Sequence, residues 1–387
     1  MAKQLAFAIV TPHTLRKSRT GGVLARLMSR TGLDLVGARM FAPGPALVRD
    51  YSALVASKGF YPARIQKRFA EYVAREFAPD AETGRRQRAM LLLFEGDNAI
   101  NKVRAVAGSP TTSWDSGDTI RGTFGECITG PDGELTYFEP AVLVARDAEH
   151  TAAVLKLWAK HSVRDGGLVE EAADVSVAKG VESTLVMLKP DNFRFPSLRA
   201  GNIVDILSRS GLRIVAMKKF SMTVAQAEDF YGPVRAILRE KFTERVSEKI
   251  HDIVQDNIEV SLTEEAEKKI TSVLGPMAGD AQFESIVHFM TGHRPTEVKD
   301  SQKKAAASEN CIALVYRGKN AIKTIRQILG PTDPSKAEPG SVRKEFGSNI
   351  MVNAAHASDS VPSAEREMGI LMIEEDNIRS IIRKYYK

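Results

Sequence analysis

The sequence contains the same pattern twice, and this repeat limits the possible folds more than any other feature. Residues 7–12 read as an apolar strand that ends at a proline. Residues 185–190 repeat this strand, with Pro12 and Pro190 178 positions apart. In each copy a helix and a second strand follow. We therefore expect two similar domains with the same order of elements.

A second set of matches lies further along the two copies, at a constant offset of 222 positions. The matching pairs are Gly96 with Gly318, Arg104 with Arg326, Gly108 with Gly330, Arg121 with Arg343 and Gly125 with Gly347. Each copy reads roughly as βαββαβ with extra helices. This pattern predicts an α+β fold of two tandem ferredoxin-like antiparallel-sheet domains with helices on one face.

The rise of the offset from 178 to 222 means that the second copy carries 44 more residues in its middle. These residues, about 233–280, are rich in Glu, Lys, Arg, Ile and Val. We expect an amphipathic helical insertion of two or more helices, broken at Gly275–Pro276. Packing on its own sheet is favoured over a partner-binding role for this insertion.

The predicted division of the chain is a first domain over residues 1–162, a linker over 163–182 and a second domain over 183–387. The linker contains two adjacent glycines, several acidic residues and alternating small residues. Helices over residues 147–161 and 377–386 are each expected to close their own domain.

Composition excludes several classes of protein. Two cysteines, Cys127 and Cys311, are too few for a disulfide framework and lack metal-ligand spacing, so we expect free thiols in a reducing cytoplasm. No apolar run approaches the ~18 residues that span a membrane, and we expect no membrane partner. The net charge of +6 suits an anionic ligand. Nucleic-acid binding is possible but not expected.

Residues 353–360 have the composition of a reactive site. His356 is flanked by alanines, which leave its ring room to meet a bulky reactant. Ser358 and Ser360 can cap the helix that follows. Glu367 then lies about two turns into that helix and can reach back toward the imidazole. An imidazole oriented by a third group is the arrangement of an activated nucleophile.

The second copy resembles the nucleoside diphosphate kinase family in four motifs that occur in the family's order. They are Lys189-Pro190-Asp191, the Thr332-Asp333-Pro334 turn, the loop over residues 339–347 and the histidine signature over residues 353–360. The resemblance covers about residues 182–387, interrupted by the insertion. It implies that His356 takes the γ-phosphate of a nucleoside triphosphate and passes it to a nucleoside diphosphate, a ping-pong covalent mechanism.

The resemblance also assigns the other roles. The expected catalytic residues are His356, Glu367 and Ser358, and the expected nucleotide-binding residues are Lys189, Tyr231, Phe283, Arg326, Thr332, Arg343 and Asn353. Cations and hydroxyl donors of this kind suit a polyphosphate. Mg²⁺ is expected to bind mainly through the nucleotide phosphates, without dedicated protein ligands. Nucleoside di- and triphosphates and a homo-oligomer are the expected partners.

The second copy departs from the family pattern at three positions. Ala357 and Lys344 stand where glycine is usual. The base-stacking position falls on Gln282, with Phe283 next to it, so the residue that stacks on the base stays open.

The first copy lacks the histidine signature and has Thr11 where Lys189 stands, although it keeps Arg104 and Arg121. If residues 141–145 form its final strand, seven residues are missing where the catalytic loop belongs. This predicts a degenerate domain without phosphotransfer that fills the place of a subunit in an oligomer. Its arginines either hold a nucleotide or brace the loop.

One alternative remains for the whole chain. Two repeats can also make a non-catalytic regulatory protein that binds nucleotide or nucleic acid. Binding alone does not need a nucleophile, so the paired His356 and Glu367 favour an enzyme.

Overall fold

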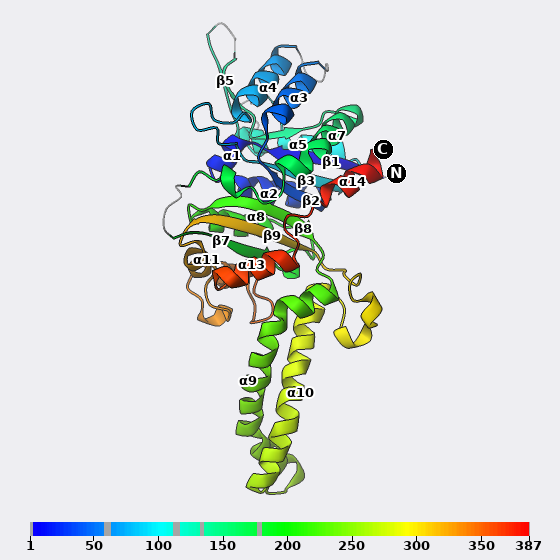
Figure 1. The fold of residues 1–387 in the computed structure, drawn as a ribbon, viewed down its shortest axis with the longest axis vertical. Coiled ribbons are helices and arrows are strands. Elements are labelled where there is room, and N and C mark those ends of the chain that lie inside the picture. Colours follow the sequence, from blue (N-terminus) through cyan, green and yellow to red (C-terminus); the bar gives the residue numbers. More distant parts are fainter. Residues whose placement is uncertain (1–2, 58–62, 111–116, 132–134, 176–179, 387) are drawn as a thin grey trace. The chain divides into compact units, whose positions relative to one another are not determined.

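The computed structural model describes residues 3–57, 63–110, 117–131, 135–175 and 180–386 (Figure 1). It divides the chain into two compact units. We call Met1–Phe220 with Cys311–Lys387 the main unit and Ser221–Asn310 the hairpin unit.

The main unit contains two four-stranded antiparallel sheets, one from each copy of the repeat. The first has the order β2–β3–β1–β6, built from β1 (Gln4–Val10), β2 (Asp34–Phe41), β3 (Ala89–Gly96) and β6 (Val142–Val144). The second has the matching order β8–β9–β7–β10, built from β7 (Val181–Leu188), β8 (Arg213–Phe220), β9 (Cys311–Lys319) and β10 (Ala355–Ala357). The predicted tandem α+β fold is confirmed.

Helices and short connections complete the main unit. In the first copy they are α1 (Pro12–Arg16), α2 (Thr20–Arg30), α3 (Pro45–Ser57), α4 (Ala63–Glu76), α5 (Ala99–Ala107), α6 (Ile120–Phe124), the β4 (Glu126–Thr129) and β5 (Leu135–Glu139) ribbon, α7 (Ala148–Asp165) and η2 (Glu170–Ala172). In the second copy they are η3 (Pro190–Asn192), α8 (Arg199–Ser208), α11 (Ala321–Leu329), η6 (Pro334–Lys336), α12 (Val342–Phe346), α13 (Val361–Ile370) and α14 (Ile378–Tyr385). Between α7 and β7, residues 176–179 of the expected linker lie outside the described residues.

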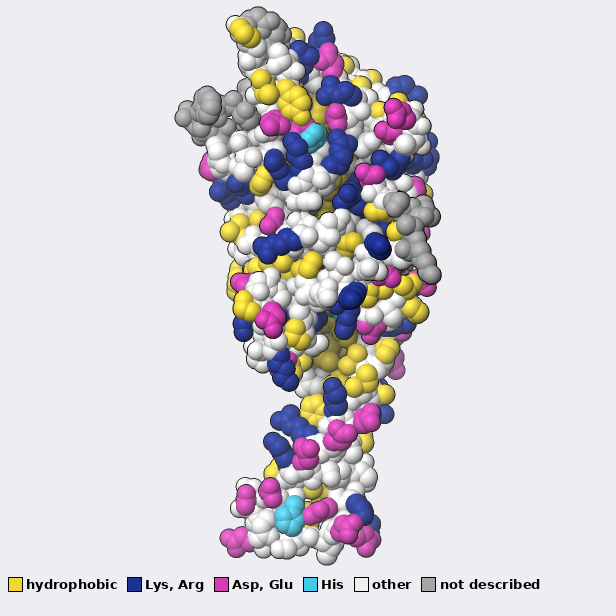
Figure 2. All heavy atoms as spheres, turned by 90° about the vertical axis from the view of Figure 1, so that its left-hand side faces the viewer, with side chains coloured by type: hydrophobic (Ala, Val, Ile, Leu, Met, Phe, Trp, Pro, Cys, Tyr) yellow, Lys and Arg dark blue, Asp and Glu magenta, His cyan; other side chains and the backbone are white. Residues whose placement is uncertain are grey.

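The hairpin unit consists of α9 (Val224–Ile258), α10 (Glu264–Thr291), η4 (Pro295–Glu297) and η5 (Asp300–Gln302). Figure 2 shows charged side chains of both signs along the two long helices. The predicted break at Gly275–Pro276 is wrong, because α10 runs through both residues and the chain turns at residues 259–263 instead. Gly275 serves helix packing: a Cβ there would lie 2.3 Å from Thr243 Oγ1 on α9. Packing against α9 therefore outweighs the helix-breaking tendency of this dipeptide.

Irregular backbone positions recur in the two copies of the main unit. Asn98 and Asn320, which precede α5 and α11, both have φ near 52°. Ala141 and Ala354, which precede the edge strands β6 and β10, have φ of 55° and 68°. Such left-handed conformations are uncommon for these residue types. The repeat therefore extends to local backbone geometry.

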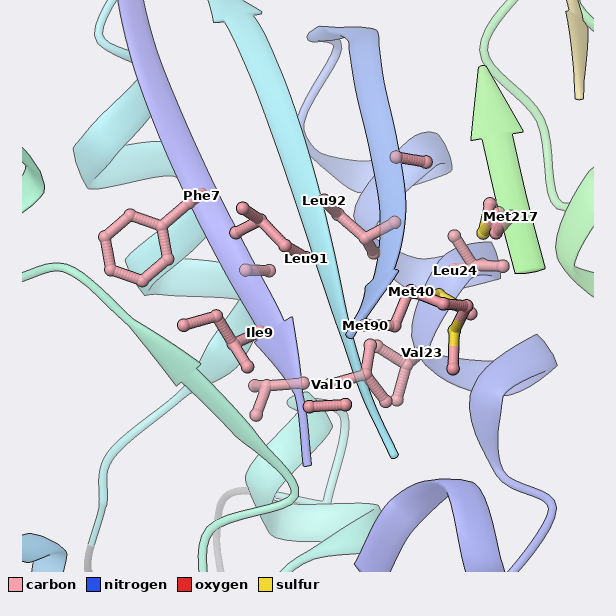
Figure 3. Packing of buried hydrophobic residues seen from close by; sticks show 14 of the residues in the cluster. Phe7, Ile9, Val10, Val23, Leu24, Met40, Met90, Leu91, Leu92 and Met217 are labelled. Carbon is pink, nitrogen blue, oxygen red and sulfur yellow. The ribbon is translucent and has the colours of Figure 1, made fainter. Parts of the chain in front are cut away.

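The two copies share one hydrophobic core. Equivalent helices, α2 and α8, pack against each other, and so do the equivalent strands β2 and β8. Figure 3 shows part of this core, with Met217 of β8 near Leu24 of α2. Two glycines permit this helix crossing. A Cβ on Gly21 would lie 2.4 Å from the backbone nitrogen of Asp205, and a Cβ on Gly201 would lie 2.3 Å from the backbone nitrogen of Ala25.

The C-terminal helix packs mainly on the first copy. α14 contacts α7, β2 and β1. Tyr386 donates its hydroxyl to the carbonyl of Leu5 at 2.9 Å, and Arg39 donates to the carbonyl of Glu375 at 2.7 Å. The expectation that this helix closes the second domain is wrong, because its apolar face finds its partners on the sheet of the other copy.

Changing Gly21 to Ala is expected to destabilise the main unit by about 1–3 kcal/mol, because the new methyl group meets backbone atoms that cannot move aside. In most helix positions the same change stabilises by about 0.5–1 kcal/mol. Gly369→Ala is the matched control, since a Cβ there meets nothing within 4 Å. Urea unfolding of the two variants checks this. Equal midpoints would contradict the close crossing.

Candidate active site

His356 lies in the middle of the edge strand β10, opposite Met187 of β7. Its neighbours Ala355 and Ala357 are buried, while the side chain of His356 is 25% exposed. The backbone amide of Lys189 donates to the carbonyl of Ala354 at 3.0 Å, which holds the strand in place just before the histidine. The ring is therefore anchored by a sheet and still reachable.

A buried carboxylate orients the ring. Ser360 caps α13, with Pro362 in the first turn, and Glu367 follows two turns later. Glu367 Oε2 lies 2.9 Å from His356 Nε2 and accepts the hydroxyl of Ser358 at 2.6 Å. An ionised carboxylate only accepts hydrogen bonds, so Nε2 carries the proton and the ring's lone pair lies at Nδ1.

A buried lysine from β8 holds the far end of this helix. Lys218 donates its Nζ to the carbonyls of Leu371 at 3.1 Å and Met372 at 2.8 Å, just past the C-terminus of α13. A cation is favourable there because the helix C-terminus carries partial negative charge. The sequence reasoning missed Lys218. Its signal was a basic residue inside an apolar strand at the repeat position of Arg39, 179 residues earlier.

Lys189 and Asn353 form a buried network beside the histidine. Lys189 Nζ donates to Asn353 Oδ1 at 2.9 Å and to the carbonyl of Met351 at 2.5 Å. Asn353 in turn donates to the carbonyl of Thr332 at 3.0 Å and to that of Ile350. Burial lowers the pKa of Lys189 to about 8. The network therefore carries a cation whose protonation changes near physiological pH.

Arg343 links the loop before α12 to the histidine strand. Its two terminal nitrogens donate to the carbonyl of Gly330 at 2.8 Å and to that of Ala355 at 3.0 Å. Its Nε–H has no hydrogen-bond partner among the described residues. Burial, followed by the charge of Arg326, lowers the pKa of Arg343 to about 10. One donor of this guanidinium thus remains for an anion.

A cleft of about 840 Å³ opens beside this network. Arg326, Thr332 and Arg343 line it, whereas His356 and Lys189 are not among the described lining residues. Ala357, the residue after the histidine, does line it. The cleft therefore adjoins the histidine strand, and Arg343 reaches both.

Three carboxylates line the cleft and were not expected from the sequence: Glu182, Glu338 and Asp359. Glu182 accepts a hydrogen bond from the backbone amide of Ile322 at 3.0 Å, in the first turn of α11. The pKa of Asp359 is lowered chiefly by its hydrogen bond to Ser363, with a smaller contribution from Arg326. Asp359 belongs to the histidine signature, which was the signal available for it.

Tyr231 and Phe283 belong to the hairpin unit. Tyr231 lies on α9 with its ring 5.0 Å from that of Phe230. Phe283 lies on α10, 4% exposed, with the guanidinium of Arg235 5.3 Å from its ring centre. Gln282 is half-buried on the same helix.

The described residues contain no group of three or more His, Cys, Asp or Glu side chains that could hold a metal ion. Neither Cys127 nor Cys311 forms a disulfide bond within the described residues. Within the same part of the chain, no helix is both long enough and apolar enough to cross a membrane.

In the first copy, apolar residues replace the histidine and the two polar residues that interact at its ring. β6 pairs with β1 as β10 pairs with β7, which places Leu143 opposite Ile9 where His356 lies opposite Met187. The same offset of 213 places Ala145 at the position of Ser358 and Val154 at that of Glu367.

The expectation of seven missing residues is wrong. Gly125 and Gly347 differ by 222 positions, whereas Ala141 and Ala354 differ by 213, so the first copy is longer here. The extra length holds the β4–β5 ribbon. The strand is retained because it completes the sheet, and only its side chains have changed.

Arg121 repeats the bonds of Arg343. It is 2% exposed and donates to the carbonyls of Gly108 at 2.7 Å and Val142 at 3.1 Å. Arg104 donates to the carbonyl of Arg146 at 2.9 Å. Both arginines therefore brace the loops of the first copy in this structure.

Comparison with known proteins places both copies in one family. The sequence profile described as nucleoside diphosphate kinase matches residues 4–131, 182–276 and 250–377, together more than half of the chain. Curated nucleoside diphosphate kinases from Archaeoglobus fulgidus and Methanococcus maripaludis are 29% and 28% identical, over 51% and 49% of this chain and 89% and 97% of theirs.

Solved structures of similar proteins include nucleoside diphosphate kinases. That of Aquifex aeolicus is 25% identical over 51% of this chain and 98% of its own, with a TM-score of 0.30. An NDP kinase from Pyrobaculum aerophilum is 25% identical over 49% and 94%, with a TM-score of 0.33.

Lys189→Met is expected to change the pH dependence of stability. A folded-state pKa of about 8 against an ordinary 10.5 means that burying the charged lysine opposes folding below pH 8. This unfavourable contribution to the free energy of folding, roughly 3 kcal/mol, decreases as pH rises toward 10.5. The variant's stability relative to wild type should therefore be higher at pH 7 than at pH 9.5, by urea unfolding. The exposed Lys323→Met serves as control, and a pH-independent difference for Lys189→Met would contradict the burial.

Proposed function

Because the chain belongs to the nucleoside diphosphate kinase family, we propose that its second copy transfers the γ-phosphate of a nucleoside triphosphate to a nucleoside diphosphate. The observation that carries this proposal is the hydrogen bond between Glu367 and His356 Nε2. It holds a partly exposed imidazole in the tautomer that a nucleophile needs. A chain that only bound nucleotides would not need this pair.

The first half-reaction forms a bond between His356 Nδ1 and the γ-phosphorus and breaks the bond from that phosphorus to the bridging oxygen. The nucleoside diphosphate leaves with both electrons of the broken bond. The phosphorylated ring keeps its proton on Nε2 and donates a hydrogen bond through it to Glu367, whose carboxylate stabilises the cationic ring. In the second half-reaction a terminal oxygen of another diphosphate attacks the phosphorus and regenerates the histidine.

Cations neutralise the charge that spreads over the phosphate oxygens during transfer. Arg326 and Thr332 line the cleft, and Arg343 reaches from it to the strand that carries His356. Lys189 adds a charge from the buried side, below its lowered pKa of about 8. We propose that these four residues bind the phosphates. Asn353 positions two of them, because it bonds both Lys189 and the Thr332 backbone.

Mg²⁺ would enter with the nucleotide, bound through the phosphate oxygens, and would supply further charge neutralisation. Asp359 has an oxygen donor set and a lowered pKa that suit such an ion or its water shell, and it lines the cleft. The contacts of Tyr231 and Phe283 with a base, the cytoplasmic location and the homo-oligomer stay predictions of the sequence.

We propose that the first copy does not transfer phosphate and acts as a structural partner. Leu143, Ala145 and Val154 offer neither a nucleophile nor a group to orient one. The contacts of α2 with α8 and of β2 with β8 join equivalent elements, as in the isologous interface of a two-fold dimer.

Phosphoryl transfer from γ-labelled ATP tests the mechanism. We expect label on the intact chain that survives alkali, is lost in acid and passes to GDP. His356→Ala should carry no label, and because this variant keeps the whole first copy, it also tests that copy. His288→Ala, at an exposed histidine of the hairpin unit, should label normally. A folded wild-type chain that takes no label would overturn the proposal.

Replacing Glu367 by Gln is expected to lower kcat by about 10²-fold with little change in KM, because the carboxylate orients the nucleophile and does not touch the nucleotide. Glu365→Gln alters an exposed glutamate on the same helix and should leave both constants unchanged. Steady-state kinetics at saturating ATP measures the difference. An unchanged kcat in the Glu367 variant would show that the ring needs no orienting carboxylate.

A further inference from the structure

A small cavity lies where the two copies of the main unit meet. Its volume is about 20 Å³. It is lined by Ser18 and Thr20 at the start of α2, by Arg88 just before β3, and by Ser208 and Tyr316 from the second copy. It is separate from the cleft beside the histidine strand. Three of its properties point to a ligand.

The first property is a buried cation without an acidic partner. Arg88 is 6% exposed, and its Nη1 donates to the carbonyl of Ile214 at 2.5 Å. Burial lowers its pKa to about 10, followed by the nearby charge of Arg213. The acidic residue with the largest effect on it, Asp174, is 2.9 Å from Arg85. Among the described residues, no carboxylate forms an ion pair with Arg88, which is rare for a buried charge.

The second property is an unsatisfied hydroxyl. Tyr316 is 1% exposed, and its hydroxyl has no hydrogen-bond partner among the described residues. Burial raises its pKa, so the phenol stays protonated and is a donor. A buried donor without a partner costs about 1–3 kcal/mol, and a ligand in the cavity that Tyr316 lines would remove this cost.

The third property is the positive end of a helix. No side chain caps the N-terminus of α2, and its first-turn amides have no partners within the helix. These amides and the hydroxyl of Thr20 favour negative charge. The carbonyls at the end of α8 do not oppose this, because Ile206, Leu207 and Ser208 accept hydrogen bonds from the turn that follows them.

We propose that this cavity binds one monatomic anion, a halide such as chloride. Its volume suits a single small particle, whereas phosphate and carboxylates are larger. A water molecule would satisfy Tyr316 but would leave the charge of Arg88 uncompensated beside Arg213. A halide satisfies both groups and the helix end.

The anion would join the two copies, because Arg88 belongs to the first and Tyr316 to the second. The repeat does not generate a second site of this kind. At the offset of 222, Asn310 corresponds to Arg88 and Phe94 to Tyr316, so both the charge and the hydroxyl are absent there. The site therefore binds one halide in each chain and stabilises the contact between the copies.

Thermal unfolding of the full chain in sodium chloride, against sodium gluconate at the same ionic strength, tests the site. Saturable stabilisation is expected, a rise in Tm of about 1–3 °C at tenfold excess over Kd. Tyr316→Phe keeps the ring and removes the donor, and Arg88→Met removes the charge, so both should lose the chloride response. Arg85→Met should keep it, because that arginine is paired with Asp174 at the surface.

Crystals grown in sodium bromide give a direct readout. Anomalous density for bromide in the cavity is expected for the wild-type chain and not for Arg88→Met. Density for a water molecule without anomalous signal would overturn the proposal. An equal chloride response in the wild-type chain and in Tyr316→Phe would also overturn it. This second variant keeps the test decisive if Arg88→Met does not fold.

Discussion

The close contact between the two copies is the constraint on which the rest of the main unit depends. Helices α2 and α8 cross where Gly21 and Gly201 leave no room for a side-chain carbon. This crossing brings β2 against β8 and makes one continuous core from residues of both copies. Because burial of apolar surface is the main force that stabilises a fold, neither copy buries its apolar faces independently.

Within the main unit, the two copies have the same backbone arrangement but different side chains at the position of the candidate site. The strand that carries His356 has a counterpart with the same pairing in the first copy, entered through an alanine with the same left-handed conformation. Pairing with β1 and the core requires the strand but not its polar side chains. Leu143 and Val154 avoid the cost of burying an imidazole and a carboxylate. The fold of the first copy therefore does not depend on polar side chains at these positions.

The first copy is nevertheless connected to the candidate active site. Arg39 and Lys218, at equivalent repeat positions, donate to backbone carbonyls in the segment that follows α13. That segment leads from Glu367 to α14, which packs on the first copy. Two buried cations, one from each copy, thus hold the segment that follows the helix carrying Glu367. Backbone acceptors, together with the Glu375 carboxylate 2.8 Å from Lys218 Nζ, explain how these cations are accommodated in the interior.

The sequence by itself determined the repeat, the order of elements along each copy and the approach of Glu367 to His356. Each depends on periodicity or on residues only 11 positions apart, which helical spacing controls. Only the tertiary structure decided that α14 crosses to the first copy, that α10 continues through Gly275–Pro276 and that Leu143 takes the position of His356. It alone brought Arg88 and Tyr316 to one cavity. These outcomes depend on contacts between distant segments, where packing overrides local preference and leaves no periodic signal.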